Sequence, residues 1–384
     1  MDTKYLIVGG GMTADAAVKG IREHDVDGPI VLVGAEPHPP YKRPPLTKGL
    51  WSSGDEAKIW KNTADAGAAL ILGRRIVALD LAARRATDDQ GDDYSYEKVL
   101  LATGGTPRRL GGDDDEVIYY RTLNDFRKLK QLSDGGASVV VIGAGFIGSE
   151  LAASLTNAGA KVTMVFPEAG VTSRVLPDGL ARFVTDYYRE KGVEMLSEET
   201  VASVSGTIVH TGSGRTLEAD AVVAGLGIVP NVELAEAAGL PVDNGIVVDK
   251  YGRVDGRDDV FAAGDVANYP NLVLGGQFRV EHEDHANTHG RFVGANMAGA
   301  NQPYDHLPFF YSDLFDLGYE AVGEVDARLA TIETWEEPNR KGTIAYVDDA
   351  GRPRGFLMWN VWDKVDAARE LIRAGEPVGE GALV

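Results

Sequence analysis

The stretch VVVIGAGFIG at residues 139–148 decides the fold, because it joins an apolar strand to a glycine-rich turn and the start of a helix. An N-terminal stretch, YLIVGGGMTA at residues 5–14, has the same plan. Each is followed by a second strand rich in β-branched residues, at 29–33 and at 161–166, so each begins a βαβ unit. The chain is therefore expected to hold two nucleotide-binding halves.

The glycine positions in both stretches match a dinucleotide-binding fingerprint. The first small residue allows the tight turn, the second lets the backbone approach the pyrophosphate, and the third lets the helix pack closely on the strand. These places are filled by Gly9, Gly11 and Ala14 in the first copy and by Gly143, Gly145 and Gly148 in the second. A single glycine-rich turn also arises by chance, but two copies in the same context predict two dinucleotide sites.

An acidic residue after the second strand of each unit is placed to accept hydrogen bonds from ribose hydroxyls. Glu36 and Glu168 stand at about the expected distance in the two halves. Because a carboxylate disfavours a 2′-phosphate, Glu168 favours NAD(H) over NADP(H) as the cofactor of the second half. Arg174 lies downstream, and it softens this preference if it reaches the cofactor.

The composition excludes several classes of function. The 384 residues carry 38 Lys and Arg against 58 Asp and Glu, a net charge of −20, which argues against nucleic-acid binding. Cysteine is absent, so there is no disulfide, thiolate metal site or redox-active dithiol, and redox chemistry must come from a bound cofactor. No apolar stretch approaches the ~20 residues of a membrane helix, and no signal peptide is recognised, so we expect a cytoplasmic protein without a membrane span.

The pattern of elements changes along the chain. A strand at 97–101 and another at 219–224 both run into turn-rich exits, and a third apolar strand ends on Gly264-Asp265 before a helix at 284–298. Past Pro303 the sequence predicts short strands and a closing helix, at 309–311, 320–325, 330–335, 342–347, 355–360 and 365–374. This last block is expected to be an α+β unit.

A compact polar cluster, HEDH at 282–285, precedes the predicted helix at 284–298. No further ligand of suitable spacing accompanies its two histidines, so no metal site is predicted. Cofactor contact, or capping of the helix by Asp284, is the preferred interpretation. The chain also lacks a nucleophile-elbow pattern, which makes hydrolysis a poor hypothesis.

With these motifs the sequence resembles the flavoprotein reductases with two dinucleotide-binding domains, and within them apoptosis-inducing factor and the ferredoxin reductases of oxygenase systems. The most specific matches are PYKRPPLTKGLW at 40–51, GSELA at 148–152 and AAGD at 262–265. Likeness to the apoptosis-inducing-factor branch rests on FPEAG at 166–170, VEHEDHA at 280–286, SDL at 312–314, GYEAVG at 318–323 and LMWNV at 357–361. No basic C-terminal insertion is present, so DNA binding is not carried over.

The resemblance implies an α/β, glutathione reductase-like fold with two Rossmann-like domains and a small C-terminal α+β domain. Residues 1–108 and 227–305 would form a discontinuous FAD-binding domain, and 109–226 the inserted NAD(H)-binding domain. Residues 306–384 would form a reductase or dimerisation-type domain that covers the flavin. A homodimer is left open.

Carried over residue by residue, the resemblance implies FAD in the first half. Gly9, Gly11 and Ala14 would meet its pyrophosphate, Glu36 the adenosine ribose, Arg43 the phosphate and adenosine portion, and Asp265 the ribitol chain. The turns that carry Thr103, Gly104, Gly227 and Gly264 would also contact cofactor. Glu281 and His282 would border the nicotinamide.

The expected catalytic residues are Lys48, Glu150 and Phe146. Lys48 would lie near flavin N5 and pair with Glu150, since a cation there stabilises reduced flavin and the carboxylate keeps the lysine charged and positioned. Phe146 would sit where the nicotinamide approaches, and Tyr311 near the isoalloxazine. The alternatives are a surface lysine for Lys48 and plain core packing for the two aromatic residues.

The function predicted is that of an FAD-dependent NAD(P)H oxidoreductase, which moves a hydride from NADH to flavin N5 and then passes electrons to an acceptor. Ferredoxin, rubredoxin, quinone and oxygen all remain open as acceptors. One alternative is an NADH-dependent ferredoxin or rubredoxin reductase. Such partners are usually acidic, so it would need a local basic patch, with Arg108, Arg109 and Arg121 as candidates. Another is a redox-responsive binding module with slow turnover.

Overall fold

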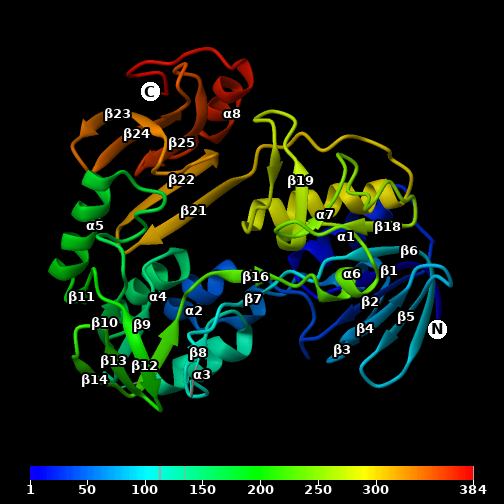
Figure 1. Ribbon diagram of the computed structural model, residues 1–384, viewed down its shortest axis with the longest axis horizontal. Coiled ribbons are helices and arrows are strands. Elements are labelled where there is room, and N and C mark those ends of the chain that lie inside the picture. Colours follow the sequence, from blue (N-terminus) through cyan, green and yellow to red (C-terminus); the bar gives the residue numbers. More distant parts are fainter. Residues whose placement is uncertain (112–113, 134, 384) are drawn as a thin grey trace. The chain divides into compact units, whose positions relative to one another are not determined.

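The computed structural model describes residues 1–111, 114–133 and 135–383, and the chain forms two compact units. The first unit comprises Met1–Lys42, Glu56–Thr106 and Val229–Pro308, and the second comprises Arg43–Asp55, Pro107–Ile228 and Phe309–Val384. Each unit combines β-sheets with covering helices (Figure 1). In the described part of the chain, no helix is both long enough and apolar enough to cross a membrane.

The first unit is built on a seven-stranded sheet in the order β3-β2-β1-β6-β5-β4, with β18 paired to β6. Strands β1, β2, β3, β6 and β18 are parallel, whereas β4 and β5 form an antiparallel edge. The strands are β1 (Asp2–Val8), β2 (Ile30–Gly34), β3 (Ala68–Leu72), β4 (Ile76–Asp80), β5 (Arg85–Asp88), β6 (Asp93–Leu101), β17 (Ile246–Val247), β18 (Val260–Ala262), β19 (Ala267–Pro270) and β20 (Gln277–Phe278). The helices are α1 (Met12–Arg22), α6 (Glu233–Ala237) and α7 (Glu283–Met297), with short 3₁₀ turns at Glu56–Lys58, Thr63–Ala66 and Gly264–Val266. Strands β7 (Gly105–Pro107) and β16 (Ile228–Pro230) lie where the chain passes between the units.

The last four residues of the central strand β1, at 5–8, are all apolar because both faces of the strand are buried there. Tyr5 and Ile7 enter the core formed with α1 and α7, whereas Leu6 and Val8 enter a second core on the opposite face of the sheet. Since successive side chains of a strand point to opposite faces, a run of four apolar residues fills both cores at once.

Helices α1 and α7 approach so closely that their contact requires glycine. A Cβ atom on Gly290 would lie 2.4 Å from the carbonyl oxygen of Thr13, and one on Gly294 would lie 2.2 Å from that of Ala17. The two glycines are four residues apart on α7, and their partners are four apart on α1, so the contact follows one face of each helix. This packing holds the helix of the first fingerprint directly against α7.

The second unit contains a parallel sheet, an antiparallel hairpin sheet and a C-terminal antiparallel sheet. Their strand orders are β11-β10-β9-β15-β8, β12-β13-β14 and β21-β22-β25-β24-β23. The strands are β8 (Ile118–Tyr119), β9 (Ser138–Ile142), β10 (Lys161–Val165), β11 (Glu194–Leu196), β12 (Val201–Ser205), β13 (Ile208–Thr211), β14 (Thr216–Glu218), β15 (Ala221–Ala224), β21 (Phe309–Leu314), β22 (Leu317–Gly323), β23 (Ala330–Glu337), β24 (Lys341–Val347) and β25 (Pro353–Trp359). The helices are α2 (Gly49–Ser53), α3 (Leu123–Ser133), α4 (Phe146–Asn157), α5 (Asp178–Glu190) and α8 (Val365–Ala374), with a 3₁₀ turn at Pro44–Thr47.

The predicted C-terminal helix at 365–374 coincides with α8, but the first two predicted strands of that block were placed too far apart. The structure has β21 at Phe309–Leu314 and β22 at Leu317–Gly323, joined by a two-residue turn in which Phe315 has φ of 63°. Asp313 pairs with Gly318 across this hairpin. Residues 312–314 and 317–319, which the prediction left outside both strands, are therefore ladder positions beside a tight turn.

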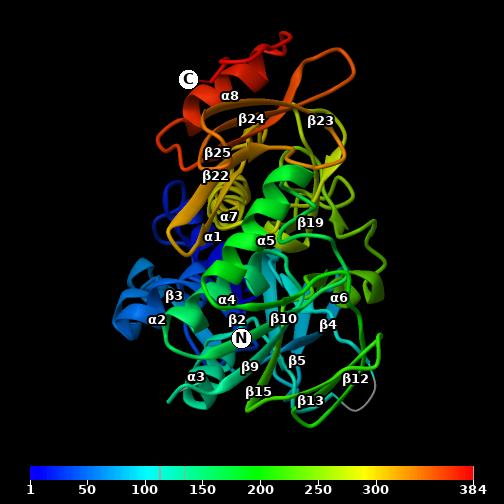
Figure 2. The ribbon, with the colours of Figure 1, turned by 90° about the vertical axis from the view of Figure 1, so that its left-hand side faces the viewer.

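Helix α5 joins the two main sheets of the second unit, as Figure 2 shows. The Tyr188 hydroxyl donates to the carbonyl of Ser149 on α4 at 2.9 Å, and its ring packs edge-on against Phe315 at 4.9 Å between centroids. Tyr187 hydrogen-bonds Asp316 in the same hairpin. One face of α5 therefore fixes the β21–β22 hairpin relative to α4.

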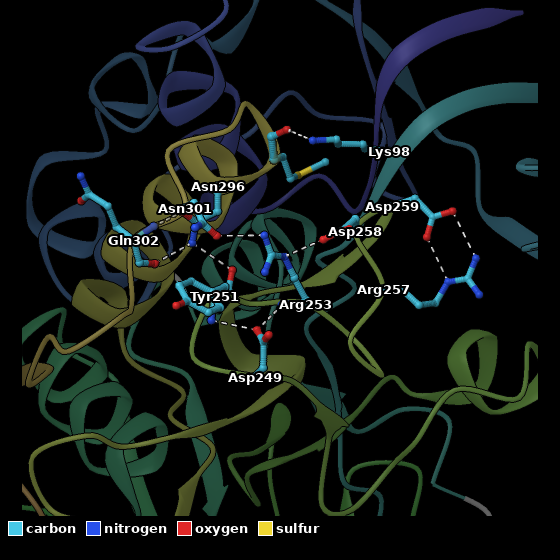
Figure 3. Close-up of polar contacts among 11 residues, drawn as sticks. Lys98, Asp249, Tyr251, Arg253, Arg257, Asp258, Asp259, Asn296, Asn301 and Gln302 are labelled. Atoms are coloured by element: carbon cyan, nitrogen blue, oxygen red, sulfur yellow. Dashed lines mark hydrogen bonds and ion pairs between the residues drawn. The ribbon is translucent and has the colours of Figure 1, made fainter.

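A polar network ties the end of α7 to the turn that precedes β18 (Figure 3). The buried Asn296 amide donates to the carbonyl oxygens of Tyr251 and Gln302, both at 3.0 Å. Its own oxygen accepts from the backbone N–H of Gln302 at 2.9 Å. Both N–H donors and the oxygen of this side chain are therefore used.

We expect Asn296→Ala to lower the free energy of unfolding by about 2–4 kcal/mol, because the two carbonyl oxygens and the one N–H that bind this buried side chain lose their partner. The measurement is urea unfolding followed by circular dichroism. The matched control is Gln302→Ala, which removes an exposed side chain but keeps the backbone groups that Asn296 binds. Equal stability of the two variants would contradict this account of the network.

Candidate active site

The first glycine-rich loop has the features that a diphosphate requires. Gly9 has φ of 132°, and a Cβ there would lie 2.1 Å from the carbonyl oxygen of Ala102, so only glycine fits. Gly11 is the N-cap of α1, makes no side-chain capping bond, and has nothing within 4 Å of a hypothetical Cβ. Ala14 is fully buried. The first turn of α1 is therefore open and has no side-chain cap, and backbone N–H groups at such a helix start can stabilise a phosphate.

The other residues predicted to hold FAD within the first unit lie at the ends of its strands. Glu36 follows β2 and accepts a hydrogen bond from the Tyr41 hydroxyl at 2.6 Å. Thr103 follows β6, donates to the carbonyl of Asn231 at 2.8 Å, and accepts from the Asn231 amide at 2.9 Å. Gly104 accepts from the Asn231 backbone at 3.0 Å. Sequence reasoning missed Asn231, which fixes this exit turn.

Gly264 and Asp265 follow β18 in a short 3₁₀ turn. Gly264 has φ of 74°, and its N–H donates to Nδ1 of the buried His289 at 3.3 Å. Asp265 is partly exposed, and Arg279 donates to its carbonyl oxygen at 3.2 Å and to the Glu281 carboxylate at 2.6 Å. The parallel strands β1, β6 and β18 thus end at one edge of the sheet, which is where α/β folds bind ligands.

The second glycine-rich loop repeats the design of the first. A Cβ on Gly143 would lie 2.7 Å from the Gly225 carbonyl oxygen, and one on Gly148 would lie 2.0 Å from that of Gly143. Gly145 caps α4 without a side-chain bond and faces open space. The three positions thus have the three roles of the fingerprint.

Glu168 follows β10 and forms an ion pair with Arg174 at 3.5 Å, while the Arg174 side chain is 89% exposed. The loop that carries both residues is fixed to the fingerprint by Thr172, whose N–H donates to the Ala144 carbonyl at 2.8 Å. Thr172 is buried and has φ of 51°, an unfavourable conformation for a β-branched residue. Sequence reasoning gave no sign of this contact, because only the backbone of Thr172 makes it.

Lys48 and Glu150 meet in the second unit and form an ion pair at 2.8 Å. Both side chains are largely buried, and Lys48 also lies 3.3 Å from Asp313 and 4.2 Å from the centre of the Tyr311 ring. The Thr47 and Ser312 hydroxyls donate to the two oxygens of Glu150, each at 2.6 Å. Lys48 is therefore held from several directions and is not a freely solvated surface lysine.

Sequence reasoning missed the roles of Thr47, Ser312 and Asp313. Thr47 and Ser312 each stand beside a predicted site residue, and the alternation of side chains along β21 was the available signal for Asp313, which is two residues after Tyr311. Ser312 lies on the buried face of the strand, whereas Tyr311 and Asp313 lie on the exposed one.

The remaining predicted residues of the second unit occupy separate positions. Phe146 is half-buried at the start of α4 and packs edge-on against Phe310 at 5.4 Å between ring centroids. Gly227 has φ of 78° and accepts from the Arg108 N–H at 3.0 Å. The Arg43 guanidinium donates to the carbonyl oxygen of Arg121 at 2.8 Å, and both residues belong to the second unit.

The histidines near α7 form an aromatic cluster with two tyrosines. His285 stacks on Tyr269 at 4.8 Å, and His289 packs against Tyr304 at 4.6 Å between ring centroids. Within the described residues, no group of three His, Asp or Glu side chains is arranged to hold a metal ion. Burial lowers the pKa of His289 to about 3 and lowers that of His285 well below its usual value, so both imidazoles are neutral at pH 7.

Two dinucleotide-type loops and a buried lysine-carboxylate pair define a nucleotide-dependent oxidoreductase, and comparison with known proteins gives the family. The family model described as pyridine nucleotide-disulphide oxidoreductase matches residues 3–290, and that of the apoptosis-inducing factor C-terminal region matches 293–354. The chain belongs to the pyridine nucleotide-disulphide oxidoreductase family. It lies in the branch with apoptosis-inducing factor and the oxygenase-type reductases, as the sequence resemblance predicted.

Individual relatives support this assignment. The chain is 35% identical to apoptosis-inducing factor 1 of Dictyostelium discoideum, over 96% of this chain and 78% of that protein. It is 36% identical to the ferredoxin–NAD(+) reductase component of the anthranilate 1,2-dioxygenase system of Burkholderia cepacia, over 97% and 94%. The crystal structure of the covalent putidaredoxin reductase–putidaredoxin complex aligns with a TM-score of 0.91 at 28% identity, covering 98% of this chain and 94% of that one. The protein is an FAD-dependent NAD(P)H oxidoreductase, and its cofactors are FAD and NAD(H).

The buried histidines make stability depend on pH. Both have folded-state pKa values below the unfolded value of about 6.5, so their contribution is complete above pH 6.5 and is lost as the pH falls below it. His285→Phe removes one such group. Between pH 6 and 4 it should reduce the slope of unfolding free energy against pH by about 1.4 kcal/mol per pH unit.

Urea unfolding at several pH values measures this slope, and His24→Phe, which replaces an exposed histidine of the same unit, is the control. The expectation fails if His285→Phe keeps the wild-type slope.

Proposed function

We propose that this protein oxidises NADH, with Lys48 and Glu150 as the polar centre of its flavin site, and passes the electrons to a small electron-carrier protein. The observation that carries the proposal is the network around Glu150, which holds the Lys48 ammonium in a largely buried position. FAD supplies the redox chemistry, since its isoalloxazine accepts a hydride and returns electrons. The residues supply binding, alignment and charge.

In this proposal the Lys48 ammonium stabilises the negative charge that accumulates during reduction. Glu150 holds the lysine ammonium in position through their ion pair, and the Thr47 and Ser312 hydroxyls fix the Glu150 carboxylate by donating to its two oxygens. Phe146 excludes water and aligns the nicotinamide ring, and Tyr311 does the same for the isoalloxazine ring. The uncapped starts of α1 and α4 bind the two diphosphates.

A ferredoxin-type acceptor is supported by the names of the relatives, which include a ferredoxin reductase component and a reductase crystallised with putidaredoxin. Of the candidate basic residues, Arg109 has its charge compensated by Asp114 at 2.9 Å and by Asp115 at 3.6 Å. This makes Arg109 a weaker candidate for binding an acidic partner protein. Arg108 and Arg121 remain candidates. Rubredoxin, a quinone and oxygen are the alternative electron acceptors, and each can replace ferredoxin in the same turnover assay.

The match to the apoptosis-inducing factor C-terminal model favours a second candidate, a redox-responsive binding module. Slow turnover with every acceptor, a lasting long-wavelength band after NADH addition and NADH-dependent self-association would support it. Fast steady-state turnover with a ferredoxin would support the electron-transfer function.

Lys48→Ala tests the function directly. We expect the variant to retain FAD but to be reduced by saturating NADH about 10- to 100-fold more slowly, equivalent to about 1.4–2.8 kcal/mol of lost transition-state stabilisation. Anaerobic rapid mixing with absorbance detection measures the rate. Lys42→Ala, an exposed lysine in the same loop, should react as the wild type does. Unchanged reduction in Lys48→Ala would remove the residue from the mechanism.

Glu168→Ala tests the preference for NADH. Removing the carboxylate releases Arg174 from its ion pair, so the ratio of kcat/KM for NADH to that for NADPH should fall by about tenfold. The gain with NADPH should disappear in Glu168→Ala/Arg174→Ala, and the exposed Glu190→Ala should have no effect. A ratio unaltered in Glu168→Ala would exclude this residue from cofactor discrimination.

A further inference from the structure

Lys48 faces two carboxylates, and these differ in how firmly they are held. Glu150 lies 2.8 Å from the ammonium and Asp313 lies 3.3 Å from it. The Glu150 side chain is 8% exposed and has a hydroxyl donor on each oxygen, whereas the Asp313 side chain is 53% exposed. Glu150 is thus the fixed partner of Lys48, and Asp313 is the partner in contact with solvent.

Asp313 lines a cavity of about 250 Å³ within the second unit, and its carboxylate is accessible to solvent there. Lys48, Trp51, Ser154 and Phe315 also line this cavity. The carboxylate is therefore close enough to act on the ammonium, and it remains open to water and ions. A charge in such a place alters the local field without supporting the core.

The formal charge of the cluster follows from these contacts. One ammonium and two carboxylates give 1 − 2 = −1, whereas Lys48 and Glu150 alone are neutral. Asp313 therefore reduces the positive potential that Lys48 presents to its surroundings. The Tyr311 ring, two residues before Asp313 on the same face of β21, has its centre 4.2 Å from the same ammonium.

We propose that Asp313 is a positioning residue that shares the Lys48 ammonium with Glu150 and thereby sets the balance between the two half-reactions of the flavin. The proposal rests on the function above, in which Lys48 stabilises the reduced flavin. With Asp313 in place, Lys48 stabilises the reduced state only partly, so the electrons leave readily. Without it, reduction becomes more favourable and reoxidation less so.

The two half-reactions can be measured separately. In the first, NADH gives up a hydride to oxidised FAD and becomes NAD⁺. In the second, 1,4-benzoquinone takes two electrons and one proton from the reduced flavin and one further proton from solvent, becoming hydroquinone and leaving oxidised FAD. The quinone is uncharged, so its encounter with the protein does not change when a surface charge is removed.

The test is Asp313→Asn in the FAD-loaded protein. At saturating NADH we expect reduction to be about three- to tenfold faster, reoxidation by benzoquinone to be slower by a similar factor, and the flavin midpoint potential to be more positive. Loss of a merely structural residue would slow both half-reactions. Asp366→Asn is the control, since Asp366 is an exposed carboxylate of the same unit that pairs with Arg369 at 3.0 Å, and it should change neither half-reaction.

A double-mutant cycle shows whether Asp313 acts through Lys48. In the Lys48→Ala background, Asp313→Asn should change neither rate by more than about twofold. The inference is overturned if Asp313→Asn slows both half-reactions, changes neither, or keeps its full effect without Lys48. Failure of the proposed function has a different signature, in which Lys48→Ala alone leaves flavin reduction unchanged.

Discussion

The placement of one buried carboxylate, Glu150, organises the second unit. A carboxylate in this position is stable only if its charge is matched and its oxygens receive hydrogen bonds. The match comes from Lys48 and the donors from Thr47 and Ser312, which lie in two other segments of the chain. The requirement to satisfy one buried charge therefore brings the 3₁₀ turn at Pro44–Thr47, helix α4 and strand β21 together.

The packing of the first unit, in contrast, depends on close contacts between backbone segments and not on a buried charge. Gly290 and Gly294 let α7 lie directly on α1, and Gly9 lets the fingerprint turn pass the carbonyl of Ala102. These contacts leave the first turn of α1 uncapped and open at the edge of the sheet. Both units thus contain a helix start without a side-chain cap, of the kind that can stabilise a diphosphate, and the second unit also holds a lysine cation beside two carboxylates.

Much of this was predictable from sequence because the decisive signals are local. The fingerprints, the C-terminal helix at 365–374 and the pairing of Lys48 with Glu150 each followed from short motifs or from the family resemblance they carry. The β21–β22 turn was not predictable, since Phe315 adopts a positive φ that its sequence does not signal. Asp313, Asn231 and Thr172 were missed because their contacts link segments far apart in the chain, or use backbone atoms that every residue has.

The most direct test of the account is anaerobic rapid mixing of the FAD-loaded protein with saturating NADH and with NADH deuterated at the transferred C4 position. The account predicts complete bleaching of the flavin in one phase, and a slower phase with the deuterated nucleotide, because transfer of that hydride is the step that the site assists. A flavin that stays oxidised, or one that bleaches at the same rate with both nucleotides, would contradict it.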